Sequence, residues 1–355
     1  MKFNHFLSAY YPDTSYGAKR FFDDMVEQAV HADALGYQAV SIPEHHGINI
    51  LLTPSPLQMA VKIAAETNNV EIATSIAVLP IRDMRIFAGE VIQADCLCDG
   101  RLVLGVGRGA FKYEIERMGV AMQDTRDKFD ESLDVLQALL TQQEVSWDGE
   151  YYQFDSLTVM PRPMNQQPPQ IMIAAMAPEA IYHCARRGFH IQTAPLAGNH
   201  QLLLDQVDAF ARGKAELGDA GEHLRLSVLR TMWLTQSPAD SANKMLQVED
   251  YYKRFDNVFS GPGEVNNGAI AALPRKQSIE DLELNVMVCS THEMIDKIGL
   301  YQEAGIEAII LSSAIACPKQ QVLEMMQRFS EEVMPHFRET KTTTNMRNKN
   351  ANHYR

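Results

Sequence analysis

Residues 40–47 read Val-Ser-Ile-Pro-Glu-His-His-Gly, an apolar strand that runs directly into a carboxylate and two imidazoles. In a parallel α/β sheet or barrel, the strand body packs in the core. The residues just beyond its carboxyl end are free to contact a ligand. Glu44, His45 and His46 occupy that position. Pro43 also suits the end of a strand before an ordinary solvated loop, so this stretch alone leaves both interpretations open.

The segments on either side repeat the pattern of a buried strand followed by an amphipathic helix. Apolar residues at three- and four-residue spacing predict the helices, and parallel neighbouring strands need such crossover helices between them. The expected strands are residues 3–8, 37–42, 70–79, 102–106, 170–175, 189–193, 224–234 and 306–311. Eight units in one chain of 355 residues predict a (β/α)8 TIM barrel with insertions rather than an open doubly wound sheet.

Three segments fall outside this alternation. Residues 145–159 carry Asp148-Gly149 between strand-like residues, which predicts an inserted hairpin. Residues 260–281 form a long irregular segment, which in a compact domain is usually functional or disordered. We expect a single barrel domain over residues 1–338 and a polar, disordered tail at 339–355, which is rich in Thr, Asn and Lys.

Composition argues against several classes of function. A formal charge of -13 disfavours nucleic acid and anionic membranes as partners. Without a signal peptide or a long apolar run, the chain is expected to be cytoplasmic. Five scattered cysteines fit a reducing compartment. Cys96 and Cys98 are interpreted as helix packing, and the adjacent His45 and His46 should diverge, so we expect no metal site.

A glycine-flanked arginine follows the fourth expected strand. Gly107-Arg108-Gly109 would let both backbone and guanidinium approach an anionic ligand, although a lone G-x-G is most often a tight turn. No dinucleotide G-x-G-x-x-G, P-loop or H-E-x-x-H pattern occurs. In a barrel all strand ends face the same side, so they should form one site. Its expected members are Glu44, His45, His46, Ser75 to Val78, Arg108, Met176 and Ala177.

Several motifs occur in order along nearly the whole chain, from Lys2 to about Thr340. They are Ile42-Pro43-Glu44-His45-His46, Ser75-Ile76-Ala77-Val78-Leu79-Pro80, Gly100-Arg101-Leu102, Gly105-Val106-Gly107-Arg108-Gly109 and Val333-Met334-Pro335-His336. Together they resemble the bacterial luciferase-like flavin monooxygenases. The fold that this resemblance implies, a (β/α)8 barrel with insertions, agrees with the strand count made without it.

The resemblance implies a two-component flavin-dependent monooxygenase. Such an enzyme binds reduced FMN from a separate flavin reductase, forms a flavin C4a-hydroperoxide with O2, and oxygenates a small, largely apolar substrate such as an aldehyde, ketone or aliphatic compound. The family also implies a homodimer. Two alternatives stay open: a deazaflavin-dependent oxidoreductase that transfers hydride, and a non-catalytic flavin-binding luciferase-like subunit.

The resemblance also implies roles for particular residues. His45 matches the family's catalytic histidine, and Glu44 matches the acid beside it. Ser75-Ile76 matches a cis non-prolyl peptide against the isoalloxazine ring, and residues 260–281 match a mobile lid. Arg108 and Arg126 match the residues that bind the flavin phosphate. Ala175 at the end of strand five, and Met176 and Ala177 after it, match the rest of the flavin site.

Two points in this assignment remain open. Glu44 could fix the tautomer of His45, or it could instead neutralise Arg108 in an ion pair at the barrel end. The family often places Ser or Thr hydroxyls on the phosphate, but Ala177 and Ala180 stand at the matching positions here. Phosphate binding would then rest on helix N-terminal amides and the two arginines, which leaves room for another flavin.

Overall fold

The main sheet closes on itself as a barrel of parallel strands. In the computed structural model, which describes residues 1–195, 200–313 and 317–337, each of eight strands pairs with the next along the chain, and the last pairs with the first. They are β1 (Lys2–Phe6), β2 (Ala39–Ile42), β3 (Glu71–Thr74), β5 (Leu102–Gly107), β8 (Gln170–Ala174), β9 (His190–Thr193), β10 (Leu226–Leu234) and β14 (Ala308–Ser312). These are the eight expected strands, so the (β/α)8 prediction is confirmed.

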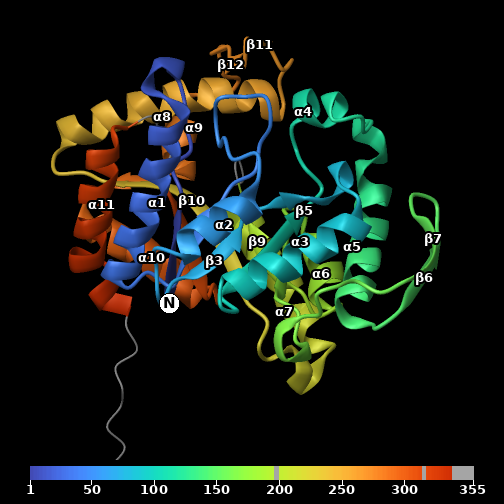
Figure 1. Ribbon diagram of the computed structural model, residues 1–355. Helices are drawn as coiled ribbons and strands as arrows, with labels where there is room; N and C mark the ends of the chain where they lie inside the picture. Colours follow the sequence, from blue (N-terminus) through green and yellow to red (C-terminus); the bar gives the residue numbers. More distant parts are fainter. Residues whose placement is uncertain (196–199, 314–316, 338–355) are drawn as a thin grey trace, which may run out of the picture.

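Helices surround the barrel, and α8 lies across its top in Figure 1. The first long helix ends at Gly36, whose left-handed φ of 77° suits glycine at a helix C-cap. The helices are α1 (Ala18–Leu35), α2 (Pro56–Ala64), α3 (Met84–Leu97), α4 (Lys112–Arg117), α5 (Thr125–Thr141), α6 (Pro178–Ala185), α7 (His200–Ala215), α8 (Pro238–Phe259), α9 (Ile279–Asn285), α10 (Thr291–Glu303) and α11 (Lys319–Glu332). Short 3-10 helices occupy Thr14–Tyr16, Leu79–Ile81, Met122–Asp124, Met164–Gln166, Gly218–Gly221 and Met334–Phe337.

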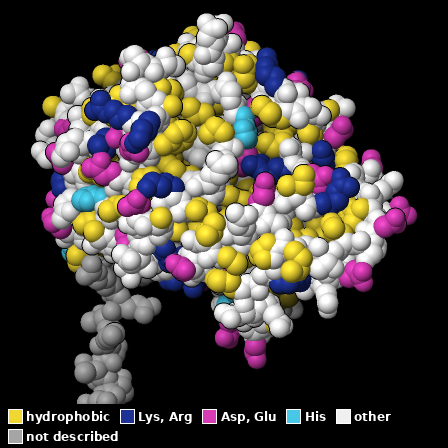
Figure 2. All heavy atoms as spheres, viewed as in Figure 1, with side chains coloured by type: hydrophobic (Ala, Val, Ile, Leu, Met, Phe, Trp, Pro, Cys, Tyr) yellow, Lys and Arg dark blue, Asp and Glu magenta, His cyan; other side chains and the backbone are white. Residues whose placement is uncertain are grey.

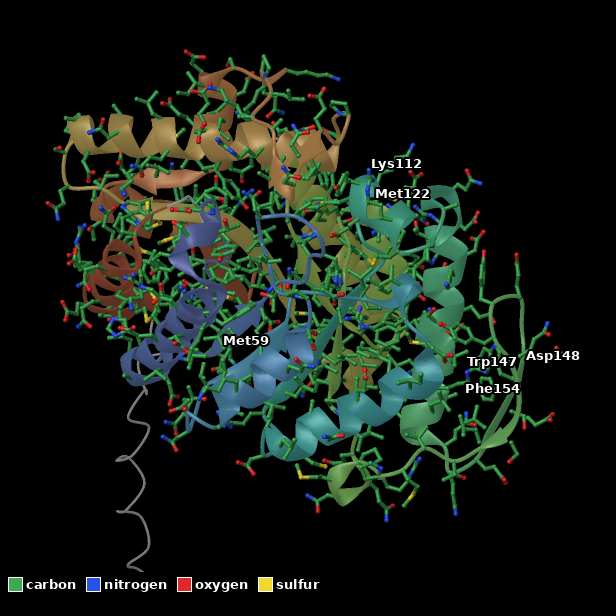
Figure 3. All side chains as sticks on the ribbon, turned by 45° about the horizontal axis from the view of Figure 1, so that its top comes forward. Met59, Lys112, Met122, Trp147, Asp148 and Phe154 are labelled. Atoms are coloured by element: carbon green, nitrogen blue, oxygen red, sulfur yellow. The ribbon has the colours of Figure 1, made fainter. Side chains whose placement is uncertain are left out.

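The predicted insertion is an antiparallel hairpin of β6 (Val145–Asp148) and β7 (Gln153–Leu157). Figure 3 shows its Trp147, Asp148 and Phe154 at one edge of the molecule. The hairpin is tied to α5 by Glu131, whose carboxylate accepts hydrogen bonds from Trp147 Nε1 at 3.1 Å and from the backbone N–H of Tyr152 at 3.0 Å. The insertion therefore packs on the side of the barrel.

The segment at 260–281 is more ordered than the sequence suggested. It contains a hairpin of β11 (Val265–Asn266) and β12 (Ala269–Ile270), and its last residues begin α9. Three further short elements were not expected: β4 (Ala77–Val78), β13 (Met287–Cys289), which pairs with the end of β10, and the six-residue α4. Elements this short carry too few residues to show a period.

Three other sequence predictions have different outcomes. Cys96 lies in α3 against the core and Cys98 is buried at its C-cap, which agrees with helix packing. The predicted tail at 339–355 lies outside the described residues. Within the described ranges, no helix is long and apolar enough to span a membrane.

Two buried histidines on the barrel strands should make stability depend on pH. Burial lowers the pKa of His5 from 6.5 to about 4, and burial with nearby His223 lowers the pKa of His190 to about 4. Between these values the unfolded chain binds more protons than the folded one, so the free energy of unfolding should fall as pH drops from 6.5 towards 4.

The expected loss for His5 alone is about 3 kcal/mol at the acid end of this window. Urea unfolding of the wild type and of His5→Gln at pH 7 and pH 5 measures it. The variant should lose less stability than the wild type between the two pH values. An equal loss in both proteins would contradict this assignment.

Candidate active site

Glu44 is buried at the end of β2, with only 2% of its surface exposed. Its Oε1 accepts hydrogen bonds from Arg82 Nη1 at 2.6 Å and from His46 Nε2 at 2.7 Å. Its Oε2 accepts one from the backbone N–H of Val78 at 3.1 Å. The carboxylate therefore joins the end of β2 to the β4 segment and neutralises a guanidinium.

His45 is held by a different carboxylate. Its Nδ1 lies 2.8 Å from Glu114 Oε1, and Glu114 Oε2 accepts a hydrogen bond from the backbone N–H of His46 at 2.9 Å. The ring stacks on Phe111 with centroids 4.2 Å apart. Within the described part of the chain, Nε2 makes no hydrogen bond, and the side chain is 14% exposed. Because Glu114 accepts the proton on Nδ1, Nε2 is left as the nitrogen that can accept or return a proton.

Both expected roles of Glu44 need correction. It does not hold His45, because adjacent residues on an extended backbone point in different directions, and it pairs with Arg82 rather than Arg108. Glu114, which orients His45, comes from α4 and was missed. Its position soon after the fourth strand and Gly109 was the signal that could have found it.

The next two strands bring the predicted flavin contacts beside this network. A cis peptide joins Ser75 and Ile76, as the resemblance implied. A Cβ placed on Gly107 of β5 would lie 2.7 Å from Ile76 Cδ1, so glycine is what lets Ile76 lie over this strand. Ser75 Oγ donates a hydrogen bond to Gln192 Oε1 at 2.9 Å.

The predicted phosphate contacts lie at the ends of the following elements. Arg108 follows β5 and Arg126 lies in the first turn of α5; both are exposed, and neither forms a hydrogen bond or ion pair with a described residue. Ala175 is buried after β8, and Met176 is exposed beside it. Ala177 is the N-cap of α6 and supplies no side-chain cap, so the amides of that first turn remain available.

These positions share one edge of the barrel because β2, β3, β5 and β8 are consecutive strands in it. Their parallel direction places all four carboxyl ends on the same face. Two guanidiniums that form no ion pair with a described residue, together with a helix N-terminus without a side-chain cap, suit a phosphate group. The residues present therefore fit a flavin phosphate. In the described ranges no group of three or more His, Cys, Asp or Glu side chains is placed to hold a metal ion.

Aromatic side chains of α8 cover the part of the barrel mouth formed by β10, β14 and β1, across from the edge formed by β2, β3, β5 and β8. A cavity of about 70 Å³ lies between barrel residues, such as Leu229 and Thr231, and the side chains of Tyr251, Tyr252 and Phe255 on α8. Tyr252 and Thr231 share a hydrogen bond of 2.9 Å between their hydroxyls. In Figure 2, hydrophobic side chains and a histidine are visible between α4 and the end of α8.

The 260–281 segment is fastened to α8 by Asn257, which is 2% exposed. Its Nδ2 donates to the carbonyls of Glu264 and Ala271, and its Oδ1 accepts from the N–H groups of Gly263 and Glu264. The hairpin also reaches the loop after His46, since the Ile270 N–H donates to Asn49 Oδ1 at 3.2 Å. This segment therefore lies close to the chain that carries His45.

Replacing Asn257 with alanine should loosen this segment, because four hydrogen bonds to backbone groups are lost. A loss of about 1–3 kcal/mol in local stability is expected for buried groups left unpaired. Limited proteolysis between residues 260 and 278 should then be at least about tenfold faster. The exposed Asn266→Ala is the matched control. Equal cleavage rates in both variants would contradict the role of Asn257.

The barrel and its mouth define the class of protein. The luciferase-like monooxygenase family model matches residues 1–308, and the chain belongs to that family.

Individual relatives in sequence and structure are named with different cofactors. The chain is 25% identical over 350 residues to the oxygenase component of a flavin-dependent trigonelline monooxygenase from Acinetobacter baylyi, covering 96% of this chain and 97% of the relative. It is 24% identical to an F420-dependent glucose-6-phosphate dehydrogenase from Amycolatopsis mediterranei, covering 89% and 94%. The oxygenating constituent of 3,6-diketocamphane monooxygenase from Pseudomonas putida, solved with FMN, superimposes with a TM-score of 0.75 at 17% identity over 95% and 98% of the two chains. The named relatives are enzymes, and the monooxygenases among them support a flavin-dependent monooxygenase, while F420-dependent relatives also occur.

Proposed function

We propose that this protein is the oxygenase component of a two-component monooxygenase that uses reduced FMN and O2. Oxygen transfer to a small organic substrate would proceed through a flavin C4a-hydroperoxide. The observation that carries the proposal is the arrangement of His45 after β2: Glu114 holds Nδ1, Nε2 makes no hydrogen bond with a described residue, and the cis Ser75–Ile76 peptide follows the neighbouring strand β3. An oriented imidazole of this kind suits general acid–base chemistry.

The choice of FMN rests on the chain's own cations and on relatives. Arg108, Arg126 and the first turn of α6 would hold the phosphate, and Ile76 would lie against the ring system. FMN is named in the related camphane enzyme. The relative from Acinetobacter is named as an oxygenase component, which supports supply of reduced flavin by a separate reductase. The proposal includes a homodimer, as the resemblance implies, and a cytoplasmic location, which the scattered cysteines favour.

The chain's residues would support oxygen transfer in two ways, by moving a proton and by excluding water. His45 Nε2 would take and return a proton at the reacting centre. The aromatic side chains of α8 and the hairpin fastened by Asn257 would keep bulk water from the mouth. Exclusion of water matters because the oxygenated cofactor otherwise releases hydrogen peroxide.

Anaerobic titration with reduced FMN, followed by mixing with oxygenated buffer, tests the function. The expected result is stoichiometric binding and an oxygenated flavin absorbance that decays more slowly than free reduced flavin oxidises. Absence of binding, or oxidation at the rate of free flavin, would contradict the proposal.

A second candidate keeps the fold and replaces oxygen transfer by hydride transfer to or from a deazaflavin. The F420-dependent relatives favour it, as does the absence of hydroxyls at Ala177 and Ala180. Binding of F420 with no affinity for reduced FMN would select this candidate.

Replacing Arg108 with alanine should weaken FMN binding much more than riboflavin binding. A charge-assisted hydrogen bond to phosphate is worth about 1.5–3 kcal/mol, which is about ten- to hundredfold in the dissociation constant. Fluorescence titration with both flavins measures the ratio, and Arg117→Ala on the exposed end of α4 is the control. Equal weakening of both flavins would show that Arg108 does not meet the phosphate.

A further inference from the structure

The cavity beneath α8 is walled on the barrel side by uncharged side chains. In β10, Leu229 and Thr231 face the barrel interior, and Thr231 is the register partner of Ser312 in β14. Alternate residues of a strand point to opposite faces, so Arg230 points outwards, where its Nε donates a hydrogen bond to the Tyr301 hydroxyl of α10. The other residues that line the cavity from the barrel and its loops are Phe6, Leu51 and Pro195. Among these described residues, no charged side chain faces the cavity.

The α8 side of the cavity is uncharged as well. Tyr251, Tyr252 and Phe255 form it, and the rings of Tyr251 and Phe255 stack with their centroids 6.3 Å apart. Burial raises the pKa of Tyr252, so its hydroxyl stays protonated at neutral pH. Asn285, at the end of α9, completes the wall and is also neutral. An ion would therefore lose its hydration here without meeting an opposite charge, and the cavity favours an uncharged ligand.

Two hydroxyl groups in this wall leave one proton unused. Thr231 Oγ1 and Tyr252 Oη lie 2.9 Å apart and share one hydrogen bond. Each hydroxyl has one proton, so whichever group donates, the group that accepts keeps an O–H that this bond does not use. Neither hydroxyl forms a second hydrogen bond with a residue that the structure describes. Because both residues line the cavity, the pair offers a hydrogen-bond donor to a ligand inside it.

We propose that the hydroxyl pair of Thr231 and Tyr252 binds the carbonyl oxygen of an uncharged substrate. The apolar body of the substrate would pack on Phe6, Leu229 and Phe255. A carbonyl oxygen only accepts hydrogen bonds, so it uses the spare proton and brings no donor that would need a partner. The same donor would stabilise the negative charge that develops on this oxygen when a nucleophile adds to the carbonyl carbon. This inference rests on the proposed function and narrows its substrate class to neutral carbonyl compounds.

Acetophenone and α-methylstyrene form a matched pair of probes, because the carbonyl of the first is replaced by a methylidene group of the same shape in the second. Their dissociation constants are measured by calorimetric titration of the full-length protein. The ratio of the two constants is compared between variants, since the hydration of the free probes is the same in every titration. Thr231→Val combined with Tyr252→Phe should weaken acetophenone binding by at least about fivefold and leave α-methylstyrene binding nearly unchanged. Each single variant keeps one hydroxyl with its proton, so it should lose less.

Tyr251→Phe and Ser312→Ala are the controls, because they remove the other two hydroxyls that line the cavity. Neither should reproduce the change in the ratio. An unchanged ratio in the double variant, or the same change in either control, would overturn the inference. So would no binding of acetophenone, or binding of the corresponding secondary alcohol at least as tight as that of acetophenone. If the double variant fails to fold, the two single variants decide, because the ratio must change in at least one of them.

Reduced FMN is titrated anaerobically into the same preparations. Normal FMN binding without the expected change in the ratio would overturn only the substrate class, whereas the expected change without FMN binding would overturn only the proposed function.

Discussion

Replacing His45 with alanine should leave reduced FMN binding nearly unchanged and should lower the yield of oxygenated product per flavin oxidised. A positioned general acid or base contributes about 10²–10⁴-fold to rate, and the loss should fall in that range. The prediction follows from the geometry of one side chain. Glu114 fixes Nδ1, the ring stacks on Phe111, and Nε2 makes no hydrogen bond with any described residue.

The neighbouring histidine is the appropriate control. His46 Nε2 is engaged by Glu44, so His46→Gln removes an imidazole from the same loop without removing the nitrogen that is free to react. Stopped-flow measurement of flavin oxidation and assay of hydrogen peroxide would separate the two variants. His45→Ala should convert oxygen consumption into peroxide. Retained coupling in His45→Ala, or an equal loss in both variants, would contradict the role given to His45.

Glu114→Gln should act through His45 and have a smaller effect. An amide of the same size keeps one acceptor but loses the negative charge that faces the imidazole. The pH profile of flavin oxidation should therefore change in Glu114→Gln, which a purely structural role would not produce. Such a change would show that α4, which follows β5, influences the reactivity of His45, which follows β2.

The barrel could be predicted from the sequence because the strand-then-helix pattern is repeated eight times in long segments. Each barrel strand has four residues or more, and most of the crossover helices are long enough to show the 3.6-residue period. The elements that were missed are short: α4 has six residues and β13 has three. Over such lengths neither period is visible, and tertiary contacts decide the conformation.

The sequence predicted which strand ends share a face, but only partly which side chains pair there. Strand ends placed Glu44, His45 and Arg108 on one face correctly, because parallel strands share a direction. Which carboxylate meets which imidazole depends on side-chain directions that sequence spacing does not encode. The partners of His45 and Glu44 come from 69 and 38 residues downstream, at Glu114 and Arg82.

Because Glu44 pairs with Arg82 and does not contact His45, we expect Glu44 to contribute strongly to the free energy of unfolding. Glu44→Ala would leave Arg82, which is 18% exposed, without its carboxylate, and would leave the Val78 N–H without an acceptor. Removing one partner of a buried ion pair typically costs about 3–5 kcal/mol. Urea unfolding should show a loss in this range for Glu44→Ala.

A double-mutant cycle with Arg82→Met distinguishes this role from catalysis. If the main cost of Glu44→Ala is the unpaired guanidinium, the double variant should recover a large part of the stability lost in the single variant. Oxygen-transfer yield per folded molecule should meanwhile stay closer to wild type than in His45→Ala, because Glu114 and not Glu44 orients the reacting imidazole. A stable Glu44→Ala protein with yield as low as that of His45→Ala would instead return Glu44 to the catalytic machinery.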